Sequence, residues 1–211
     1  IRLAVSNPDL DIGNIETVLD DLTQTCYFLS VENNRYKFSL SPNLNKLLAD
    51  RRASIQTEQV RQLVKGEIQG IFASGLGVER VFYPDKSNQI PDRPALTFVI
   101  LSSEQSIKEE TKVYKFIDEM TQTYGKSART FKSALIWLVP DNDSILNDEA
   151  RKLIAWEAIQ IEEDELKLDE TQKKLLTENI KRAERDLKEA IWRTYKNIVL
   201  LDKNNKLKTI D

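Results

Sequence analysis

Two short apolar runs separated by an amphipathic segment constrain the fold of this chain more than any other feature. Residues 95–101 form an almost continuous run of apolar and β-branched side chains, and residues 131–139 form a second run that stops at Pro140 and Asp141. Between the runs, four apolar residues repeat at helical spacing: Val113, Phe116, Ile117 and Met120. A strand, a helix and a second strand predict a right-handed parallel crossover, with strands covered on both faces.

The segments around this crossover predict a small, largely parallel sheet with helices. Residues 78–83 have the pattern of a further strand, and residues 145–159 have that of the helix after the second run. Ser106 and Glu109 stand three positions apart, which is the spacing of a capping box. We therefore expect the crossover helix to begin at Ser106.

The first 40 residues predict a helix followed by a β-hairpin. Asp9 and Asp11 are placed to cap a helix whose apolar positions recur every three or four residues: Ile12, Ile15, Leu19 and Leu22. Apolar and polar residues then alternate on both sides of Asn33-Asn34, a pair suited to a tight turn. The alternating apolar residues are Tyr27, Leu29, Val31, Tyr36, Phe38 and Leu40.

A second helix is expected directly after the hairpin. Ser41 precedes Pro42, a capping residue followed by the residue best tolerated at the first helical position, and this helix should run to about Ala53 or on to Ile71. A helix followed by a hairpin is typical of the back half of a winged helix. In that arrangement Arg35 and Lys37 would lie on the wing.

The last 50 residues predict a long helix and a terminal hairpin. Asp169 and Gln172 have capping-box spacing, and apolar residues recur from Leu176 to Ile191 over about eight turns. The partner of this helix should be the helix that contains Trp156, in an antiparallel helical hairpin. Trp192 and Tyr195 are expected to pack in the core or on the sheet. Two short strands, residues 198–201 and 207–210, are expected to close the chain.

The predicted fold is therefore a mixed α/β (α+β) structure in three segments. Residues 1–72 form a winged-helix-like segment and a connecting helix, and residues 73–160 form a small α/β unit. Residues 161–211 form the long amphipathic helix and the terminal hairpin.

Charge is unevenly distributed along the chain, although the formal net charge is −3. Residues 31–65 carry seven basic and three acidic side chains, whereas residues 147–170 carry three basic and nine acidic ones. In the winged-helix interpretation, five basic side chains would contact DNA phosphates: Arg35, Lys37, Lys46, Arg51 and Arg52. The alternative is that they pair with acids of the same chain, such as Asp50 and those between residues 162 and 170.

Several classes of chemistry are excluded by composition. The chain has no histidine and a single cysteine, Cys26, which excludes a Ser/His/Asp triad, the common zinc sites and an intramolecular disulfide. Gly125-Lys126-Ser127 is similar to the end of a phosphate loop, but Met120 stands where that loop needs its first glycine, and a helix precedes the segment where a strand is needed. We therefore expect no nucleotide site here. The apolar runs are also far shorter than the roughly 20 residues of a membrane span, so we expect a cytoplasmic protein.

Carboxylates follow both apolar runs, at the positions where ligands collect in open α/β sheets. Glu104 follows the first run, and Asp141 and Asp143 follow the second. Such a set could hold Mg²⁺ for phosphodiester chemistry, as in a metal-dependent nuclease. The competing interpretation is that these residues form turns and cap helices.

Two parts of the chain combine unusual residue orders. One joins residues 26–29 (CYFL), 33–39 (NNRYKFS) and 42–51 (PNLNKLLADR), and the other joins residues 156–159 (WEAI), 166–173 (LKLDETQK) and 195–200 (YKNIVL). Together they closely resemble the C-terminal region of a large uncharacterised prokaryotic family of AAA+-type ATPases. The genes of that family lie beside DNA methyltransferase and helicase genes in operons similar to phage-defence systems.

The resemblance implies a function for the chain. ATP and Mg²⁺ would bind in an ATPase domain upstream of Ile1, with no cofactor in this chain. We expect a non-catalytic region that couples the motor to DNA or to a protein partner, such as a methyltransferase or helicase subunit, in a defence or modification system. Two alternatives stay open: the nuclease-like α/β domain described above and a pure assembly module.

Overall fold

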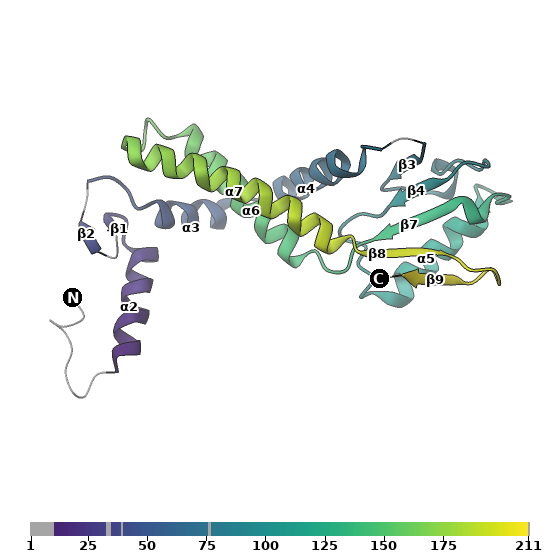
Figure 1. Cartoon of the computed structure of the whole chain (residues 1–211), viewed down its shortest axis with the longest axis horizontal. Helices are drawn as coiled ribbons and strands as arrows, with labels where there is room; N and C mark the ends of the chain where they lie inside the picture. Colours follow the sequence, from purple (N-terminus) through teal and green to yellow (C-terminus); the bar gives the residue numbers. More distant parts are fainter. Residues whose placement is uncertain (1–10, 33–34, 39, 76, 211) are drawn as a thin grey trace. The chain divides into compact units, whose positions relative to one another are not determined.

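The computed structural model describes residues 11–32, 35–38, 40–75 and 77–210 and has a mixed α/β fold (Figure 1). Packing divides the chain into two compact units. Unit 1 comprises Ile1–Gln56 and Arg151–Glu184, and unit 2 comprises Thr57–Ala150 and Arg185–Asp211. The helix that begins at Thr57 belongs to unit 2, together with the sheet.

Unit 1 begins with the predicted helix and hairpin. The elements are α2 (Ile12–Thr25), β1 (Leu29–Glu32), β2 (Arg35–Phe38) and α3 (Leu44–Ser54). The Asp11 carboxylate caps α2 by accepting a hydrogen bond of 2.9 Å from the Gly13 N–H, as predicted. β1 and β2 pair antiparallel, with Glu32 opposite Arg35, which confirms the hairpin. The predicted turn at Asn33-Asn34 and the predicted cap Asp9 lie outside the described residues, and the winged-helix identity stays a prediction.

Asn43 joins α2 to α3. Its buried side-chain amide donates to the carbonyls of Thr23 and Cys26 at the end of α2, and its Oδ1 accepts from Asn45 N–H at 2.9 Å. Asn43 is therefore the cap of α3, so the expected helix start at Ser41-Pro42 is wrong by two residues. Asn43 caps α3 in place of Ser41, because its side-chain amide satisfies backbone groups at the end of α2 and at the start of α3.

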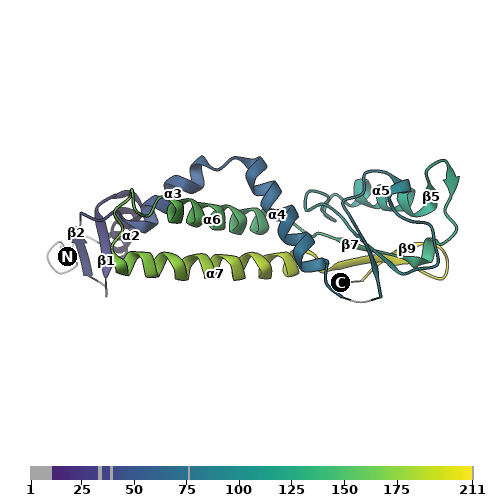
Figure 2. The ribbon, with the colours of Figure 1, turned by 90° about the horizontal axis from the view of Figure 1, so that it is seen from above.

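Parts of two antiparallel helices, residues 151–161 and 170–184, complete unit 1. α6 (Ser144–Ile161) and α7 (Glu170–Thr194) lie side by side there in both views (Figures 1 and 2). The predicted capping box is present, because Gln172 N–H donates to Asp169 Oδ1 at 2.8 Å and Asp169 N–H donates to Gln172 Oε1 at 3.2 Å. The Gln172 amide also donates to the Pro42 carbonyl at 2.8 Å, which ties the start of α7 to the segment before α3.

Unit 2 is built on one five-stranded sheet in the order β3-β4-β7-β8-β9. Its strands are β3 (Glu79–Phe82), β4 (Thr97–Ile100), β7 (Leu135–Val139), β8 (Asn197–Leu201) and β9 (Leu207–Ile210). β3, β4 and β7 are parallel, as predicted for a crossover. β8 pairs antiparallel with β7, and β9 pairs antiparallel with β8. The predicted terminal hairpin is confirmed, and it extends the central sheet.

The helix α5 (Glu110–Gln122) covers one face of this sheet. Val113, Ile117 and Met120 of α5 pack with the strand residues that point toward them, and Trp137 of β7 is buried in the same cluster. α5 starts four residues later than expected, because the Ser106 hydroxyl bonds the Asp141 carbonyl and accepts from Lys108 N–H, so Ser106 forms a turn. The other face of the sheet carries a second set of apolar side chains.

The helix α4 (Thr57–Phe72) and the end of α7 also belong to unit 2. α3 and α4 are separate helices that meet at Ile55 and Gln56, so a continuous helix to Ile71 is not formed. At the end of α7, the buried Tyr195 hydroxyl donates to the Leu101 carbonyl at 2.7 Å, and burial raises its pKa. Trp192 is 58% exposed and contacts Phe72 edge to face, so the expectation of core packing is wrong for this residue. None of the described helices has the length and apolar character needed to cross a membrane.

Removing the Tyr195 hydroxyl should destabilise the protein measurably. Tyr195→Phe leaves the buried Leu101 carbonyl without its donor, and the expected loss is about 1–3 kcal/mol of unfolding free energy in urea titrations followed by circular dichroism. Tyr27→Phe, at an exposed ring, is the matched control and should change stability by less than about 0.5 kcal/mol. Equal stability of both variants would contradict this role.

Candidate functional site

The basic residues predicted to meet DNA lie on two elements of unit 1. Arg35 and Lys37 are exposed on the same side of β2, two positions apart. Lys46, Arg51 and Arg52 lie on α3. The structure therefore places the five residues on neighbouring elements of the chain, as the sequence indicated.

Two of these basic residues form salt bridges with acidic residues of the same unit. Lys46 Nζ lies 2.6 Å from Asp50 one turn along α3, and the Arg51 guanidinium pairs with Glu162 at the end of α6. Lys37 and Arg52 each take part in an interaction of their own. The intramolecular pairing considered as the alternative to DNA contact is therefore present for Lys46 and Arg51.

The acidic segment after α6 is neutralised in a similar way. Lys173 of α7 lies 2.9 Å from Asp164 and 3.6 Å from Glu163, and its hydrogen bond to Asp164 raises the Lys173 pKa. Together with the Arg51 pair, these contacts bring opposite charges from separate parts of the sequence into one unit. The charge asymmetry along the chain is thus partly cancelled in three dimensions.

Large apolar side chains are also exposed in this part of unit 1. On the hairpin and the residues next to it, Phe38 is 82% exposed, Leu40 is 98% exposed and Phe28 is 51% exposed. The large apolar side chains at this end of unit 1 are therefore available for contact with another protein.

Of the three acids in the nuclease alternative, Glu104 and Asp143 have carboxylates bonded to other side chains, and Asp141 is held through its backbone. Glu104 Oε1 accepts from Arg61 Nε at 2.6 Å, and Asp143 Oδ2 accepts from the Asn147 amide at 2.9 Å. The Asp141 carbonyl accepts from Ser106, and its N–H donates to the Thr194 carbonyl at 2.8 Å. Among the residues that the structure describes, no group of three or more cysteine, aspartate or glutamate side chains could hold a metal ion. The structure therefore does not bring Glu104, Asp141 and Asp143 together as a metal centre.

Gly125 and Lys126 form the turn of a small hairpin. This turn connects β5 (Thr123–Tyr124) to β6 (Ser127–Ala128), which pair antiparallel, and Gly125 has a φ of +60°. A positive φ at the first turn position suits a two-residue hairpin and glycine in particular. The segment thus differs from a phosphate loop, which joins a strand to a helix.

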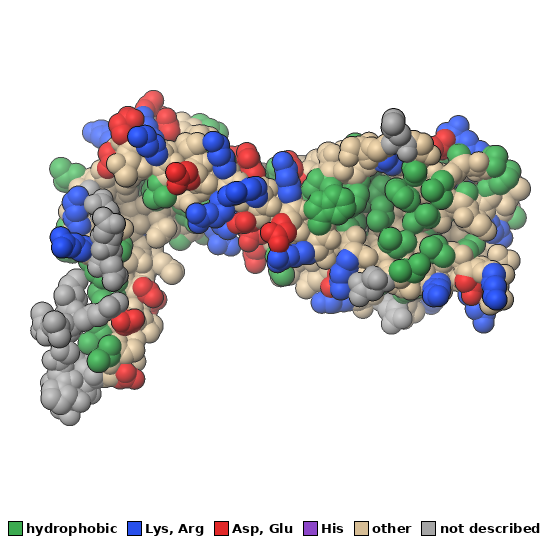
Figure 3. Space-filling view, in the orientation of Figure 1, with side chains coloured by type: hydrophobic (Ala, Val, Ile, Leu, Met, Phe, Trp, Pro, Cys, Tyr) green, Lys and Arg blue, Asp and Glu red, His purple; other side chains and the backbone are tan. Residues whose placement is uncertain are grey.

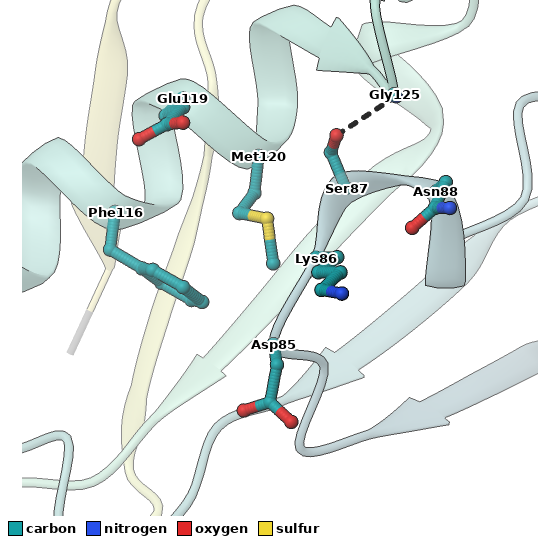
Figure 4. A pocket seen from close by; sticks show the side chains of 8 residues that line it. All are labelled: Asp85, Lys86, Ser87, Asn88, Phe116, Glu119, Met120 and Gly125. Atoms are coloured by element: carbon teal, nitrogen blue, oxygen red, sulfur yellow. Dashed lines mark hydrogen bonds between the residues drawn. The ribbon is translucent and has the colours of Figure 1, made fainter.

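A cavity of about 370 Å³ opens between α5 and the loop after β3. Phe116 and Met120 extend from α5 toward Lys86 and Ser87, and the Ser87 hydroxyl accepts from the Gly125 N–H at 3.0 Å (Figure 4). Asp85 and Glu119 also line the cavity. Its charges are of both signs, and its lining residues include no nucleophile paired with a base, so the arrangement has no catalytic constellation.

One wall of this cavity depends on a buried arginine. Arg129 is 2% exposed, and its guanidinium donates to the carbonyls of Met120, Ile90, Pro91 and Ser87 at 2.8–3.3 Å. Beside it, the Asp92 carboxylate accepts from the backbone N–H groups of Phe131 and Thr130, which lowers the Asp92 pKa. These bonds fix the loop between β3 and β4, which has only a single 3₁₀ turn, η1 (Ser87–Gln89), as regular structure.

Arg129 and Asp92 could not be predicted from the sequence pattern. A lone arginine between a hairpin and a strand has no periodic or spacing signal, and the backbone carbonyls that it binds are present in every residue type.

Scans of family models and searches of curated proteins and solved structures found no match to the chain.

Replacing Arg129 should destabilise unit 2. Arg129→Met keeps the apolar stem but removes the donors to four carbonyls, and the expected cost is about 3 kcal/mol or more, because bonds from a charged donor contribute about 1.5–3 kcal/mol each. The control is Arg93→Met, which breaks an exposed pair with Glu79 and should cost less than about 1 kcal/mol. Equal urea midpoints for the two variants would contradict the role of Arg129 in fixing the loop between β3 and β4.

Proposed function

We propose that this chain is a non-catalytic C-terminal region of an AAA+-type ATPase that couples the motor to a protein partner in a defence or modification system. The resemblance of the two segments given above supports the ATPase parent. In that parent, ATP and Mg²⁺ bind upstream, and the partners are the upstream ATPase domain and a methyltransferase or helicase subunit. The cytoplasm is the compartment where such systems meet DNA.

The observation that carries the choice of a protein partner over DNA is the pairing of Lys46 with Asp50 and of Arg51 with Glu162. A base that neutralises a phosphate must give up its carboxylate partner, so each internal pair reduces the gain from DNA contact. DNA affinity in non-specific complexes rises with the number of phosphates neutralised. Because at least two of the five bases are paired within the chain, their electrostatic footprint for DNA is weak.

The apolar side chains of the hairpin support the same choice. Phe38 and Leu40 expose large apolar surfaces on the hairpin segment that also carries the exposed Arg35. Protein interfaces are enriched in aromatic and arginine side chains at their centres, whereas contacts to DNA phosphates come mainly from polar and charged groups. The hairpin thus has the composition of a protein-binding surface.

Duplex binding by this chain should be weaker than about 10⁻⁴ M, the weak limit of ordinary non-specific binding at physiological salt. The measurement is fluorescence anisotropy with a labelled duplex at two salt concentrations. Arg51→Ala should leave the anisotropy unchanged and lower the unfolding free energy by about 0–1 kcal/mol. Micromolar binding with a log–log salt slope of about −3.6, reduced by about one unit in Arg51→Ala, would show that the bases contact phosphates and would overturn the protein-partner proposal.

The purified chain should not hydrolyse ATP. Lys126 lies in a hairpin turn, and the strand–loop–helix order of a phosphate loop is not formed around it. Phosphate release should therefore stay at the buffer baseline for the chain and for Lys126→Ala alike. Turnover that survives ion-exchange and size-exclusion steps at constant specific activity would require a nucleotide site within the chain.

A further inference from the structure

The face of the sheet opposite α5 is apolar across four strands. Side chains alternate along a strand, so residues next to the buried Val99, Trp137 and Val199 point to this second face. We define the open sheet face by five of them, Phe98, Ile136, Leu138, Ile198 and Leu200, together with Ile210, which pairs in register with Ile198. The first five are partly exposed, and Ile210 is 47% exposed. All six belong to unit 2.

This face resembles an interior surface more than an ordinary exterior. Sheets with parallel strands are nearly always covered on both faces. Here β3, β4 and β7 are parallel and α5 packs on one face, while on the other face Ile100 at the end of β4 is fully buried and the six residues are exposed in part. Hydrophobic side chains gather over the strands of unit 2 in the space-filling view (Figure 3). Contiguous exposed apolar patches on soluble domains mark sites of contact with other proteins.

Two cations border the face at opposite edges of the sheet. Arg80 of β3 pairs in register with Phe98, which pairs with Ile136. At the other edge, the exposed Lys208 of β9 pairs with Leu200. The Arg80 guanidinium donates to the carbonyls of Ser74, Gly75 and Val78, and because a carbonyl has no net charge, its positive charge remains at the edge. An apolar strip bounded by positive charge favours an occupant with acidic flanks.

The same charges disfavour a second copy of this chain as the occupant. If two copies packed face to face about a two-fold axis parallel to the strands, Arg80 of one copy would lie opposite Lys208 of the other. Like charges placed opposite each other oppose association. A partner with complementary charge meets no such penalty.

We propose that the open sheet face docks one amphipathic α-helix of a partner protein, whose apolar stripe covers the six residues and whose acidic flanks face Arg80 and Lys208. The inference rests on the proposed partner-coupling function and assigns its surface and the chemistry of its partner. Five strands spaced by about 4.8 Å separate the two edges by roughly 19 Å, and a helix with its side chains is about 10–12 Å wide. One helix therefore fits between Arg80 and Lys208, and long acidic side chains on its flanks can reach both cations.

The test uses two synthetic helical peptides with the same leucine stripe and either glutamate or lysine flanks. Fluorescence anisotropy should show that the chain binds the glutamate peptide about tenfold or more tightly than the lysine peptide. The double variant Ile136→Thr and Ile198→Thr, which keeps β-branched side chains, should weaken glutamate-peptide binding about tenfold. Ile161→Thr, the same change at an exposed position of unit 1, is the matched control and should bind like the unchanged chain.

Lys208→Glu is a second variant, at an exposed edge position where folding is not at risk. It should reduce the preference for the glutamate peptide several-fold. Equal affinity for the two peptides, or binding unaffected by both sets of variants, would overturn the inference. Sedimentation equilibrium that shows dimers lost in the Ile136/Ile198 double variant would assign the face to a second copy and overturn it as well.

Failure of this inference can be separated from failure of the proposed function by measuring duplex binding on the same proteins. Tight, salt-dependent duplex binding together with the expected peptide preference would overturn the proposed function alone. Loss of the peptide preference without duplex binding would overturn the sheet-face inference alone.

Discussion

Burial of the parallel pair β4 and β7 is the constraint on which unit 2 depends. Val99 and Trp137 lie opposite each other in this pair, both are buried under α5, and the Trp137 indole N–H donates to the Thr121 hydroxyl of α5 at 3.0 Å. A buried indole N–H without an acceptor is costly, so this bond fixes where α5 lies on the sheet. The loop before β4 passes the C-terminal end of α5, where Arg129 donates hydrogen bonds to carbonyls of both the loop and the helix.

The two units solve the same problem of buried backbone groups with different side chains. Unit 1 uses the Asn43 amide, which serves the last carbonyls of α2 and caps α3. Unit 2 uses the Arg129 guanidinium, which serves carbonyls of a loop and of the end of α5. In both cases a single side chain with several donors replaces the hydrogen bonds that regular structure would supply.

Periodicity predicted the elements whose formation depends on neighbouring residues. The cap at Asp11, the hairpin of β1 and β2, the parallel crossover and the Asp169–Gln172 capping box all have local signals, and all are formed. Positions decided by distant contacts were missed, because Ser106 is diverted by the Asp141 carbonyl and the start of α3 is set by the end of α2. For the candidate site, the basic residues could be predicted from charge, and the sequence also suggested acids as their partners. The partner of Arg51 lies in the predicted acidic segment of residues 162–170, but the choice of Glu162 could not be predicted, since the pair joins residues 111 positions apart.

The position of β8 in the sheet has a consequence for the order of folding. β7 ends at Val139, and its neighbour β8 begins only at Asn197, after both long helices have been made. During synthesis, the parallel strands therefore emerge with the edge of β7 unpaired, and they remain so until residues 197–201 leave the ribosome. At about 5–20 residues per second this interval lasts several seconds, during which an apolar strand edge is open to other chains. Folding of unit 2 thus depends on long-range pairing late in translation, which slows it relative to the local helical hairpin.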